Sequence, residues 1–170
     1  MRIRRAGPRD ARAFAALARS EIETGLPHRW TAARLTALLG SPDTNAYALV
    51  PARGPGIGGF SVARLGLDSG HLILHAIAPG LRRHGFGREL LDWQVRAAVT
   101  AGLTALTLEV RAGNADARHF YTTRGFRDEC RLPRYYAGRE DALRLRLDPL
   151  ATNGPPPPFP ARPDSTDHRR

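Results

Sequence analysis

Residues 71–90 read HLILHAIAPGLRRHGFGREL, which is an apolar run, a loop with three glycines and the beginning of a helical pattern. The run has the length and apolar content of a strand, and it stops at a Pro-Gly pair that breaks regular structure. After the loop, apolar residues recur at helical spacing. We therefore predict a strand over His71–Ala78 and a helix over Arg88–Ala101, joined by a glycine-bearing loop.

The loop carries the features of an anion site. The first turn of a helix has unpaired N–H groups and a partial positive charge, so a loop that leads into it can bind a pyrophosphate. Gly85 and Gly87 lack the side chains that would keep those N–H groups away from phosphate oxygens. Arg82, Arg83 and Arg88 add positive charge. The stretch therefore predicts a phosphate-binding turn between the strand and the helix.

Two other interpretations of these glycines stay open from the loop alone. A dinucleotide fingerprint also begins with Gly-x-Gly, but Leu90 stands where its third glycine belongs. A loop that its glycines make flexible, and that binds no ligand, is the second alternative. The loop is not isolated, however, because the next predicted strand supplies further polar residues.

That strand, Thr104–Arg111, alternates with a period of two. Leu106 and Leu108 face one way, whereas Glu109 faces the other way and lies near the carboxyl end, where open α/β sheets bind their ligands. A polar strand residue paired with Arg111 is the simpler interpretation of Glu109. The position of this carboxylate nevertheless makes it a candidate site residue.

A helix over Asn114–Arg124 is predicted to follow this strand. Asn114 is a suitable N-cap, and Tyr121 lies two turns later on the same side. Tyr121 could be a core aromatic or a site residue. Gly125 then ends the helix and leads into the next strand.

The remaining segments complete an α/β pattern with an open mixed sheet and helices on both faces. Residues 1–149 form one domain in this interpretation, and the Pro-rich residues 150–170 form a disordered tail. The further predicted elements are the strands Arg2–Arg5, Ala46–Val50, Gly59–Leu67, Phe126–Leu132 and Asp141–Leu147, a helix after Pro8, and a helix that Thr31 caps.

The composition excludes several classes of enzyme. All 26 basic residues are arginine, so there is no lysine for a Walker-type phosphate loop, a Schiff base or pyridoxal chemistry. The net charge of +10 suits a polyanionic ligand, but no basic run interleaved with aromatic residues indicates specific nucleic-acid binding. No apolar run approaches the roughly 20 residues of a membrane span. The single cysteine, Cys130, favours a reducing cytoplasm.

Taken in order, these motifs resemble the GNAT (Gcn5-related) N-acetyltransferase superfamily. The resemblance covers roughly residues 57–147 and is carried by Arg82-x-x-Gly85-x-Gly87, LEVRAGN at 108–114, Phe120-Tyr121 and Gly125-Phe126. The strings EVRAGN at 109–114 and RYYAGREDA at 134–142 are similar, more narrowly, to the RimI-type ribosomal-protein alanine N-acetyltransferases. Residues 25–30 match no motif of that type.

The resemblance implies a mostly antiparallel sheet that splays between its fourth and fifth strands and takes acetyl-CoA as co-substrate, without a metal. It implies that the pantetheine arm pairs with the backbone of the fourth strand and that the glycine loop wraps the pyrophosphate. The implied acetyl-CoA-binding residues are His75, Ala76, Ile77, Arg82, Arg83, His84, Gly85, Phe86, Gly87, Arg88, Asn114 and Tyr121.

The resemblance also implies the catalytic roles. Glu109 corresponds to a general base for the attacking amine, and Tyr121 to a general acid that protonates the leaving thiolate. Tyr135 and Tyr136 either pack in the closing hairpin or contact the acceptor. His71 and His75 share a strand face without a third ligand at suitable spacing, so no metal site is predicted.

The expected activity is acetyl transfer to a protein N-terminal α-amine, including that of a ribosomal protein. A small-amine acceptor such as an antibiotic, polyamine or amino acid is the first alternative. A non-catalytic acetyl-CoA sensor and a nucleic-acid-binding module are the others. A cytoplasmic monomer or weak homodimer without a membrane partner is expected.

Overall fold

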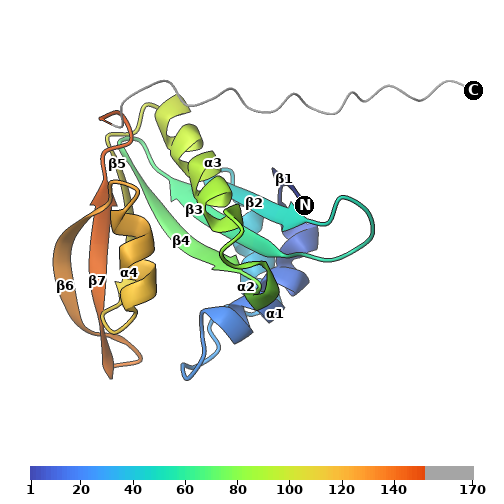
Figure 1. Ribbon diagram of the computed structural model, residues 1–170, viewed down its shortest axis with the longest axis horizontal. Helices are drawn as coiled ribbons and strands as arrows, with labels where there is room; N and C mark the ends of the chain where they lie inside the picture. The colour runs from blue at the N-terminus through green and yellow to red at the C-terminus, as the bar shows by residue number, and fades with distance from the viewer. Residues whose placement is uncertain (152–170) are drawn as a thin grey trace, which may run out of the picture.

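Seven strands form one mixed sheet in the computed structural model, which describes residues 1–151 (Figure 1). Their order across the sheet is β1–β2–β3–β4–β5–β7–β6. The strands are β1 (Arg2–Arg5), β2 (Thr44–Val50), β3 (Gly59–Leu65), β4 (Ser69–Ile77), β5 (Ala105–Arg111), β6 (Arg127–Tyr136) and β7 (Glu140–Leu147). The helices are α1 (Ala11–Glu21), α2 (Ala32–Leu39), α3 (Phe86–Thr100) and α4 (Ala115–Thr122). The predicted α/β class is confirmed, whereas the Pro-rich tail beyond residue 151 lies outside the described residues.

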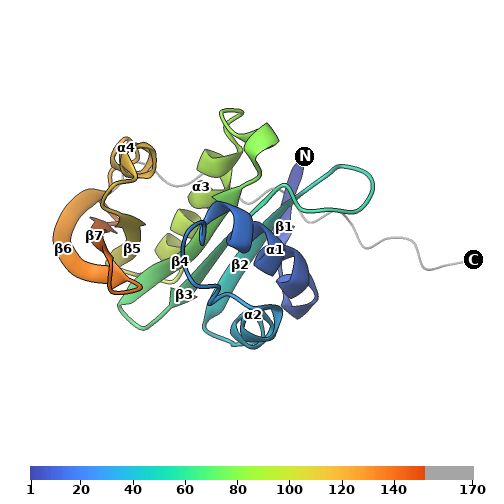
Figure 2. The same cartoon turned by 90° about the horizontal axis from the view of Figure 1, so that it is seen from below.

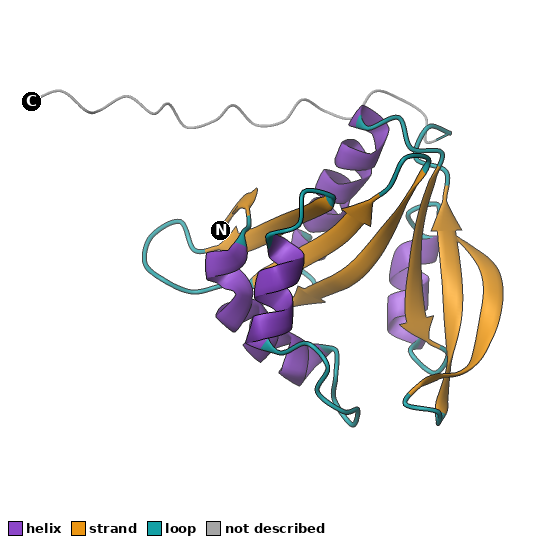
Figure 3. Cartoon of the chain, turned by 180° about the vertical axis from the view of Figure 1, so that it is seen from behind, coloured by secondary structure: helices purple, strands orange, loops and turns teal. Residues whose placement is uncertain are grey.

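The sheet opens between β4 and β5. These two strands are parallel and pair over three positions, from Ser69 with Ala105 to His71 with Thr107. Beyond His71 they separate, so that the β1–β4 half and the β5–β7 half diverge (Figure 3). The register between β3 and β4 shifts next to Val62, and a bulge of this kind increases local twist. The predicted splay between the fourth and fifth strands is confirmed.

Helices cover both faces of the sheet, as predicted. α1 and α2 lie on one face, and α3 and α4 lie on the other (Figure 2). Phe14 of α1 stacks on Phe60 of β3, with ring centroids 4.2 Å apart, in the buried cluster of the β1–β4 half. Tyr121 of α4 and Phe126 belong to a second buried cluster, which joins the β5–β7 half to residues of β3, β4 and α3. The first cluster therefore packs α1 and α2 on the β1–β4 half, and the second connects the two halves at the end where β4 and β5 pair.

The closing hairpin extends further than the sequence predicts. β6 continues to Tyr136, four residues past the expected end at Leu132. Pro133 does not end the strand because β6 lies at the edge of the sheet, where the N–H that proline lacks has no neighbouring strand to bond. The register shifts between Leu132 and Tyr136, and Arg134 has a φ of 53°. The kink at these residues turns the end of β6.

A buried polar cluster fixes α3 on the sheet. The Gln94 amide is fully buried and accepts a hydrogen bond from Asn45 Nδ2 at 3.0 Å. It also donates to Ser61 Oγ at 3.0 Å and to the Asn45 carbonyl at 3.2 Å. Because buried polar groups are costly unless paired, these three residues specify one position of α3 over β2 and β3.

The substitution Gln94→Leu tests this cluster. It leaves the buried polar groups of Asn45 and Ser61 without partners, at about 1–3 kcal/mol for each unsatisfied group. We expect the free energy of unfolding, measured by urea denaturation, to fall by about 2–4 kcal/mol. The exposed Glu89→Leu substitution on the same helix is the control and should change it by less than about 0.5 kcal/mol. Equal effects of the two substitutions would contradict the assignment.

Candidate active site

A cavity of about 810 Å³ opens where β4 and β5 separate. Its wall combines the α1–α2 connection, β4, β5, α4 and the end of β6. The predicted site residues in this wall are His75, Glu109, Asn114, Tyr121, Tyr135 and Tyr136. The structure thus brings the two predicted catalytic side chains to one cavity. The loop from Arg82 to Arg88 lies at the carboxyl end of β4, outside this wall.

Alternate backbone groups of β4 turn toward the opening. The Ala78 N–H donates to the Gly58 carbonyl, on the β3 side, at 2.8 Å. Because an antiparallel ladder alternates, the N–H and C=O groups of Ile77 and His75 point away from β3 and into the gap, whereas those of Ala76 face β3. At the gap, the Ile77 carbonyl accepts a hydrogen bond from Arg82 Nε at 3.2 Å. An extended ligand can therefore add to β4 in the manner of a strand.

The glycine loop presents the first turn of α3. Gly85 is its N-cap, in the left-handed conformation with a φ of 84° that favours glycine, and the helix begins at Phe86, two residues before the predicted start. Gly87 lies in the first turn, where a Cβ would stand 3.5 Å from Ile77 and 3.6 Å from Phe120. The unpaired N–H groups of this turn are the helix-terminal donors that suit phosphate oxygens.

The three arginines of the loop have different surroundings. Arg82 is ion-paired with Glu21 of α1, which ties the loop to the end of that helix beside the cavity. The Arg83 side chain is 87% exposed. Arg88 Nε lies 3.6 Å from Asp92, one turn further along α3. Arg83 and Arg88 are therefore the guanidinium groups that solvent-borne anions reach most readily.

The other two loop residues have structural contacts. His84 Nδ1 lies 2.7 Å from the Arg82 carbonyl, within the turn. The Phe86 ring packs against the buried cluster of Tyr47, Leu49 and Leu90. Phe86 is accordingly placed to offer a backbone N–H rather than its side chain to a ligand.

Glu109 lies on β5 with a side chain that is 6% exposed. Its Oε1 accepts a hydrogen bond from Arg144 Nε at 2.8 Å, and its Oε2 lies 3.0 Å from His71 Nε2. Burial would raise the pKa of Glu109, but the hydrogen bonds from His71 and Arg144 outweigh burial and hold this pKa below its usual range. The carboxylate is therefore ionised at neutral pH. Arg111 is not its partner, in contrast to the simpler interpretation of the sequence, and pairs with Glu140 at 3.6 Å.

Tyr121 is buried in α4, with its hydroxyl 3.1 Å from His75 Nδ1. Burial raises the pKa of Tyr121 well above its usual range, so the phenol stays protonated. Burial also lowers the pKa of His75 to about 4, against an opposing contribution from the Gly87 backbone. Its Nε2 is buried without a partner at hydrogen-bond geometry. Tyr121 is thus both a core aromatic, packed on Phe126 at 5.4 Å, and a cavity residue with a polar tip.

Three further predicted residues, Asn114, Tyr135 and Tyr136, also line the cavity. Asn114 is the N-cap of α4, and its Oδ1 accepts from the Ala117 N–H at 3.0 Å. Tyr135 and Tyr136 pack edge to face at 5.1 Å. Burial is the main cause that raises the pKa of each phenol, and the nearby Glu109 carboxylate adds to it. The kinked end of β6 therefore lies close to Glu109.

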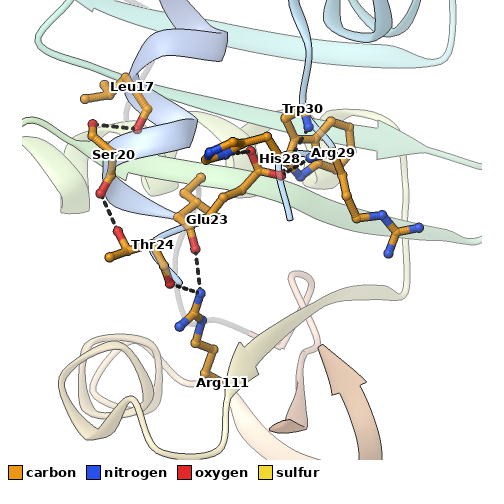
Figure 4. Close-up of polar contacts among 9 residues, drawn as sticks. Leu17, Ser20, Glu23, Thr24, His28, Arg29, Trp30 and Arg111 are labelled. Carbon is orange, nitrogen blue, oxygen red and sulfur yellow. Dashed lines mark hydrogen bonds and ion pairs between the residues drawn. The ribbon is translucent and has the colours of Figure 1, made fainter. Parts of the chain in front are cut away.

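The α1–α2 connection forms the wall opposite β5, and two side chains hold it in place (Figure 4). The Glu23 side chain is 5% exposed, and its Oε1 accepts from the backbone N–H groups of Arg29 at 2.6 Å and Trp30 at 3.1 Å. Arg111 Nη2 reaches across from β5 to the carbonyls of Ile22 at 3.2 Å and Thr24 at 2.7 Å. Residues 25–30 of this connection match no RimI-type motif, and the contacts of Glu23 and Arg111 hold the connection at both of its ends.

Several of these contacts have no sequence signal. Arg144 and Arg111 meet their partners through strand pairing and loop packing that span 35 and 89 residues, respectively. The contacts of Glu23 could not be predicted either, because the sequence shows only an acidic residue after a predicted helix. His71 has a weak signal, because it precedes an apolar strand, but its contact with Glu109 depends on the parallel pairing of β4 with β5.

The expectation that His71 and His75 share a face is wrong. One extra β4 residue opposite β3 reverses the alternation. His75 therefore faces Tyr121 of α4, whereas His71 faces Glu109.

Residues 1–151 lack two features of other functional classes. No three His, Cys, Asp or Glu side chains in this range gather as metal ligands would. None of its helices has the length and apolarity that crossing a bilayer requires. Cys130, on β6, is exposed and is not among the cavity residues.

Comparison with known proteins identifies related chains. Residues 19–126 match the family model described as the acetyltransferase (GNAT) family. The [ribosomal protein bS18]-alanine N-acetyltransferase of Escherichia coli strain K12 is 36% identical over 91 residues, which are 52% of this chain and 62% of that protein. The human N-alpha-acetyltransferase 30 is 35% identical over 78 residues, 46% of this chain and 22% of that protein. The matched segment thus spans less than two thirds of these curated relatives.

Solved structures agree with the sequence relatives. The crystal structure of the ribosomal-protein-S18-alanine N-acetyltransferase from Escherichia coli superposes with a TM-score of 0.76 at 25% identity, over 93% of this chain and 99% of that one. Nourseothricin acetyltransferase shares the fold, with a TM-score of 0.69 at 24% identity over 86% of this chain and 97% of that one.

The substitution Arg111→Met tests how the α1–α2 connection is held. It removes two charge-assisted hydrogen bonds to backbone carbonyls, each worth about 1.5–3 kcal/mol. Amide hydrogen exchange over residues 22–30 should accelerate by roughly tenfold or more, because local opening becomes easier. Arg127→Met, on the exposed edge strand, should leave exchange in this segment unchanged. Unchanged exchange in the Arg111 variant would show that the connection is held by other contacts.

Proposed function

The chain belongs to the acetyltransferase (GNAT) family, and we propose that it transfers an acetyl group from acetyl-CoA to a primary amine, with a protein N-terminal α-amine as acceptor. One observation carries the proposal: β4 and β5 part beside a glycine-capped helix terminus, and the cavity at that opening holds a carboxylate and a phenol. The gap suits an extended thioester arm, and the helix terminus suits its phosphates.

The donor substrate fits the chain's own groups. Backbone groups of Ile77 and His75 face the gap and can pair with the amides of a pantetheine arm. First-turn N–H groups around Gly87, together with Arg83 and Arg88, can hold a pyrophosphate. In this arrangement the Ile77 N–H polarises the thioester carbonyl, in the manner of an oxyanion-hole donor. Asn114, at the start of α4, borders the arm from the other side.

Glu109 and Tyr121 divide the proton transfers. An α-ammonium group has a pKa near 8 and must lose a proton before its nitrogen can attack the thioester carbon. The ionised Glu109 carboxylate accepts that proton, directly or through water. The C–S bond breaks with its electron pair on sulfur, and the Tyr121 phenol protonates the thiolate and regains a proton from solvent. Direct transfer within a ternary complex needs no covalent enzyme intermediate.

The identity of the amine that accepts the acetyl group is a separate part of the proposal. The bacterial and human relatives are named for acetylation of an alanine of ribosomal protein bS18 and for N-alpha-acetylation, which supports a peptide N-terminus, including that of a ribosomal protein made in the cytoplasm. The α1–α2 connection and the end of β6, with Tyr135 and Tyr136, border the cavity where such a chain would enter. The nourseothricin enzyme shares the fold alone, and a small amine is the competing acceptor.

Release of coenzyme A against a panel of acceptors tests the proposal. The panel contains short peptides with free N-termini, matched peptides with blocked N-termini, and small amines. The proposal predicts release with free N-termini and none with the blocked peptides. Release only with small amines would move the acceptor to that class. Binding of coenzyme A without turnover on any amine would favour a sensor and contradict the proposed activity.

The variants Glu109→Gln and Tyr121→Phe test the assigned roles. Each removes a proton-transfer group but keeps the shape of the side chain, so kcat should fall by about 10²–10⁴-fold. The dissociation constant of acetyl-CoA, measured by calorimetry, should stay within about threefold, a free-energy change below about 0.7 kcal/mol. Glu129→Gln, on the exposed face of β6, is the matched control and should retain wild-type kcat. Wild-type turnover in either test variant would refute the role of that residue.

The variant Gly87→Ala separates ligand binding from folding. A Cβ at this position makes only ordinary contacts in the fold, and alanine favours a helix by about 0.5–1 kcal/mol, so the melting temperature should not fall. The same methyl group blocks phosphate approach, and the dissociation constant of acetyl-CoA should rise about tenfold or more, as expected for a lost charge-assisted hydrogen bond. Gly80→Ala, in the preceding turn with open space around it, should bind normally.

A further inference from the structure

Both carboxylate oxygens of Glu109, the proposed proton acceptor, have a polar side chain within hydrogen-bond distance. Arg144 Nε donates to Glu109 Oε1 at 2.8 Å, and His71 Nε2 lies 3.0 Å from Oε2. A guanidinium does not release its proton in proteins, whereas an imidazole gains and loses one near neutral pH. Of these two neighbours, His71 is therefore the one that can exchange protons with the carboxylate.

The second ring nitrogen of His71 also faces an oxygen. Nδ1 lies 3.0 Å from Thr107 Oγ1, and this hydroxyl donates to the Gly70 carbonyl at 3.3 Å. A hydroxyl has one proton to donate, so Thr107 in this arrangement accepts the Nδ1 proton. In neutral His71 of this tautomer the lone pair of Nε2 faces the Glu109 carboxylate, and the hydrogen bond from His71 that lowers the pKa of Glu109 forms when Nε2 takes up a proton. The contact between Nε2 and Oε2 is favourable when one proton lies between these atoms and unfavourable when none does.

The position of His71 in the fold allows a proton on its ring to pass to solvent. His71 and Thr107 are the last paired residues before β4 and β5 separate, so the ring lies at the apex of the opening. The His71 side chain is 38% exposed and lines the cavity, whereas Glu109 is 6% exposed. A proton that reaches the imidazole can therefore pass to water, which the buried carboxylate cannot do as readily.

We propose that His71 and Glu109 act as one proton-accepting pair, in which His71 holds the proton that the acceptor amine loses. The inference rests on the proposed acetyl transfer. The N–H bond of the ammonium breaks and its electron pair forms the bond to the acetyl carbon. The proton passes to the Glu109 carboxylate and comes to rest on His71 Nε2, because imidazole is the stronger base of the two. The imidazolium then releases it to solvent. His71 is a positioning residue here, since Glu109 meets the amine.

The ring has charged and titratable neighbours on several elements. Glu109 contacts it directly, and the hydroxyl of Thr107 is uncharged. The other groups that surround the pair are Arg144 on β7, Arg64 on β3 opposite His71, Tyr135 and Tyr136 at the end of β6, and Arg29 in the α1–α2 connection.

The pH dependence of kcat for a peptide acceptor tests the pair in His71→Gln. Glutamine can still donate to Glu109 but cannot hold a second proton, so only the carboxylate remains to titrate. We expect kcat at neutral pH to fall about tenfold or more with KM within about threefold, and the acid limb of the kcat profile to move at least about one pH unit lower. A wild-type kcat with an unmoved limb would overturn the proposal.

Two further variants separate the pair from a general structural effect. Thr107→Val removes the acceptor of the Nδ1 proton and should move the acid limb in the same direction, whereas Thr107→Ser keeps the hydroxyl and should restore the wild-type profile. His119→Gln, on the exposed surface of α4, is the matched control and should retain the wild-type kcat and limb. A limb that stays in place in Thr107→Val would count against the proton position on Nε2.

A measurement without turnover separates this inference from the proposed function. The titration of the His71 ring is followed by NMR in the wild type and in Glu109→Gln. Loss of the carboxylate removes the partner of the imidazolium, so the midpoint should move to lower pH. An unchanged midpoint would overturn the pair even in an active enzyme. A moved midpoint in a protein that acetylates no amine would keep the coupling and reject the acetyl transfer.

Discussion

The parting of β4 from β5 is the constraint on which the rest of the molecule depends. Two parallel strands normally satisfy each other's backbone groups along their length, but here pairing stops at His71. The free edge of β4 then needs partners that a ligand can supply. One buried cluster packs α1 and α2 on the β1–β4 half, and the other joins the two halves where β4 and β5 pair, so the strands cannot close beyond His71 without disturbing this packing.

The polar contacts around the opening follow from this geometry. The Arg111 guanidinium connects β5 to the α1–α2 connection across the opening, and the Arg82–Glu21 pair connects the loop after β4 to α1 on the same half of the sheet. Inside the cavity, Glu109 and Tyr121 have opposite pKa shifts, one carboxylate kept ionised and one phenol kept protonated. A pair of groups held in opposite protonation states is the arrangement that a base and an acid require.

Much of this could be predicted from the sequence, for local reasons. The neighbouring residues are enough to predict the roles of Gly85 and Gly87, which precede an amphipathic helix. The same is true of Glu109, which lies near the end of an alternating strand. The extent of β6 could not be predicted, because Pro133 is tolerated only at a sheet edge, and edge positions depend on strand order. The contacts of Glu109 with Arg144 and His71 likewise depend on strand pairing, which a single sequence does not specify.

A crystal structure of the full chain with coenzyme A is the most direct test of the central claim, that the gap between β4 and β5 is the site of the donor substrate. We expect the pantetheine arm to lie in the gap and to bond to backbone groups of Ile77 and His75, with the pyrophosphate at the first turn of α3 near Gly87. Coenzyme A bound elsewhere on the surface, with the gap unchanged and empty, would contradict it.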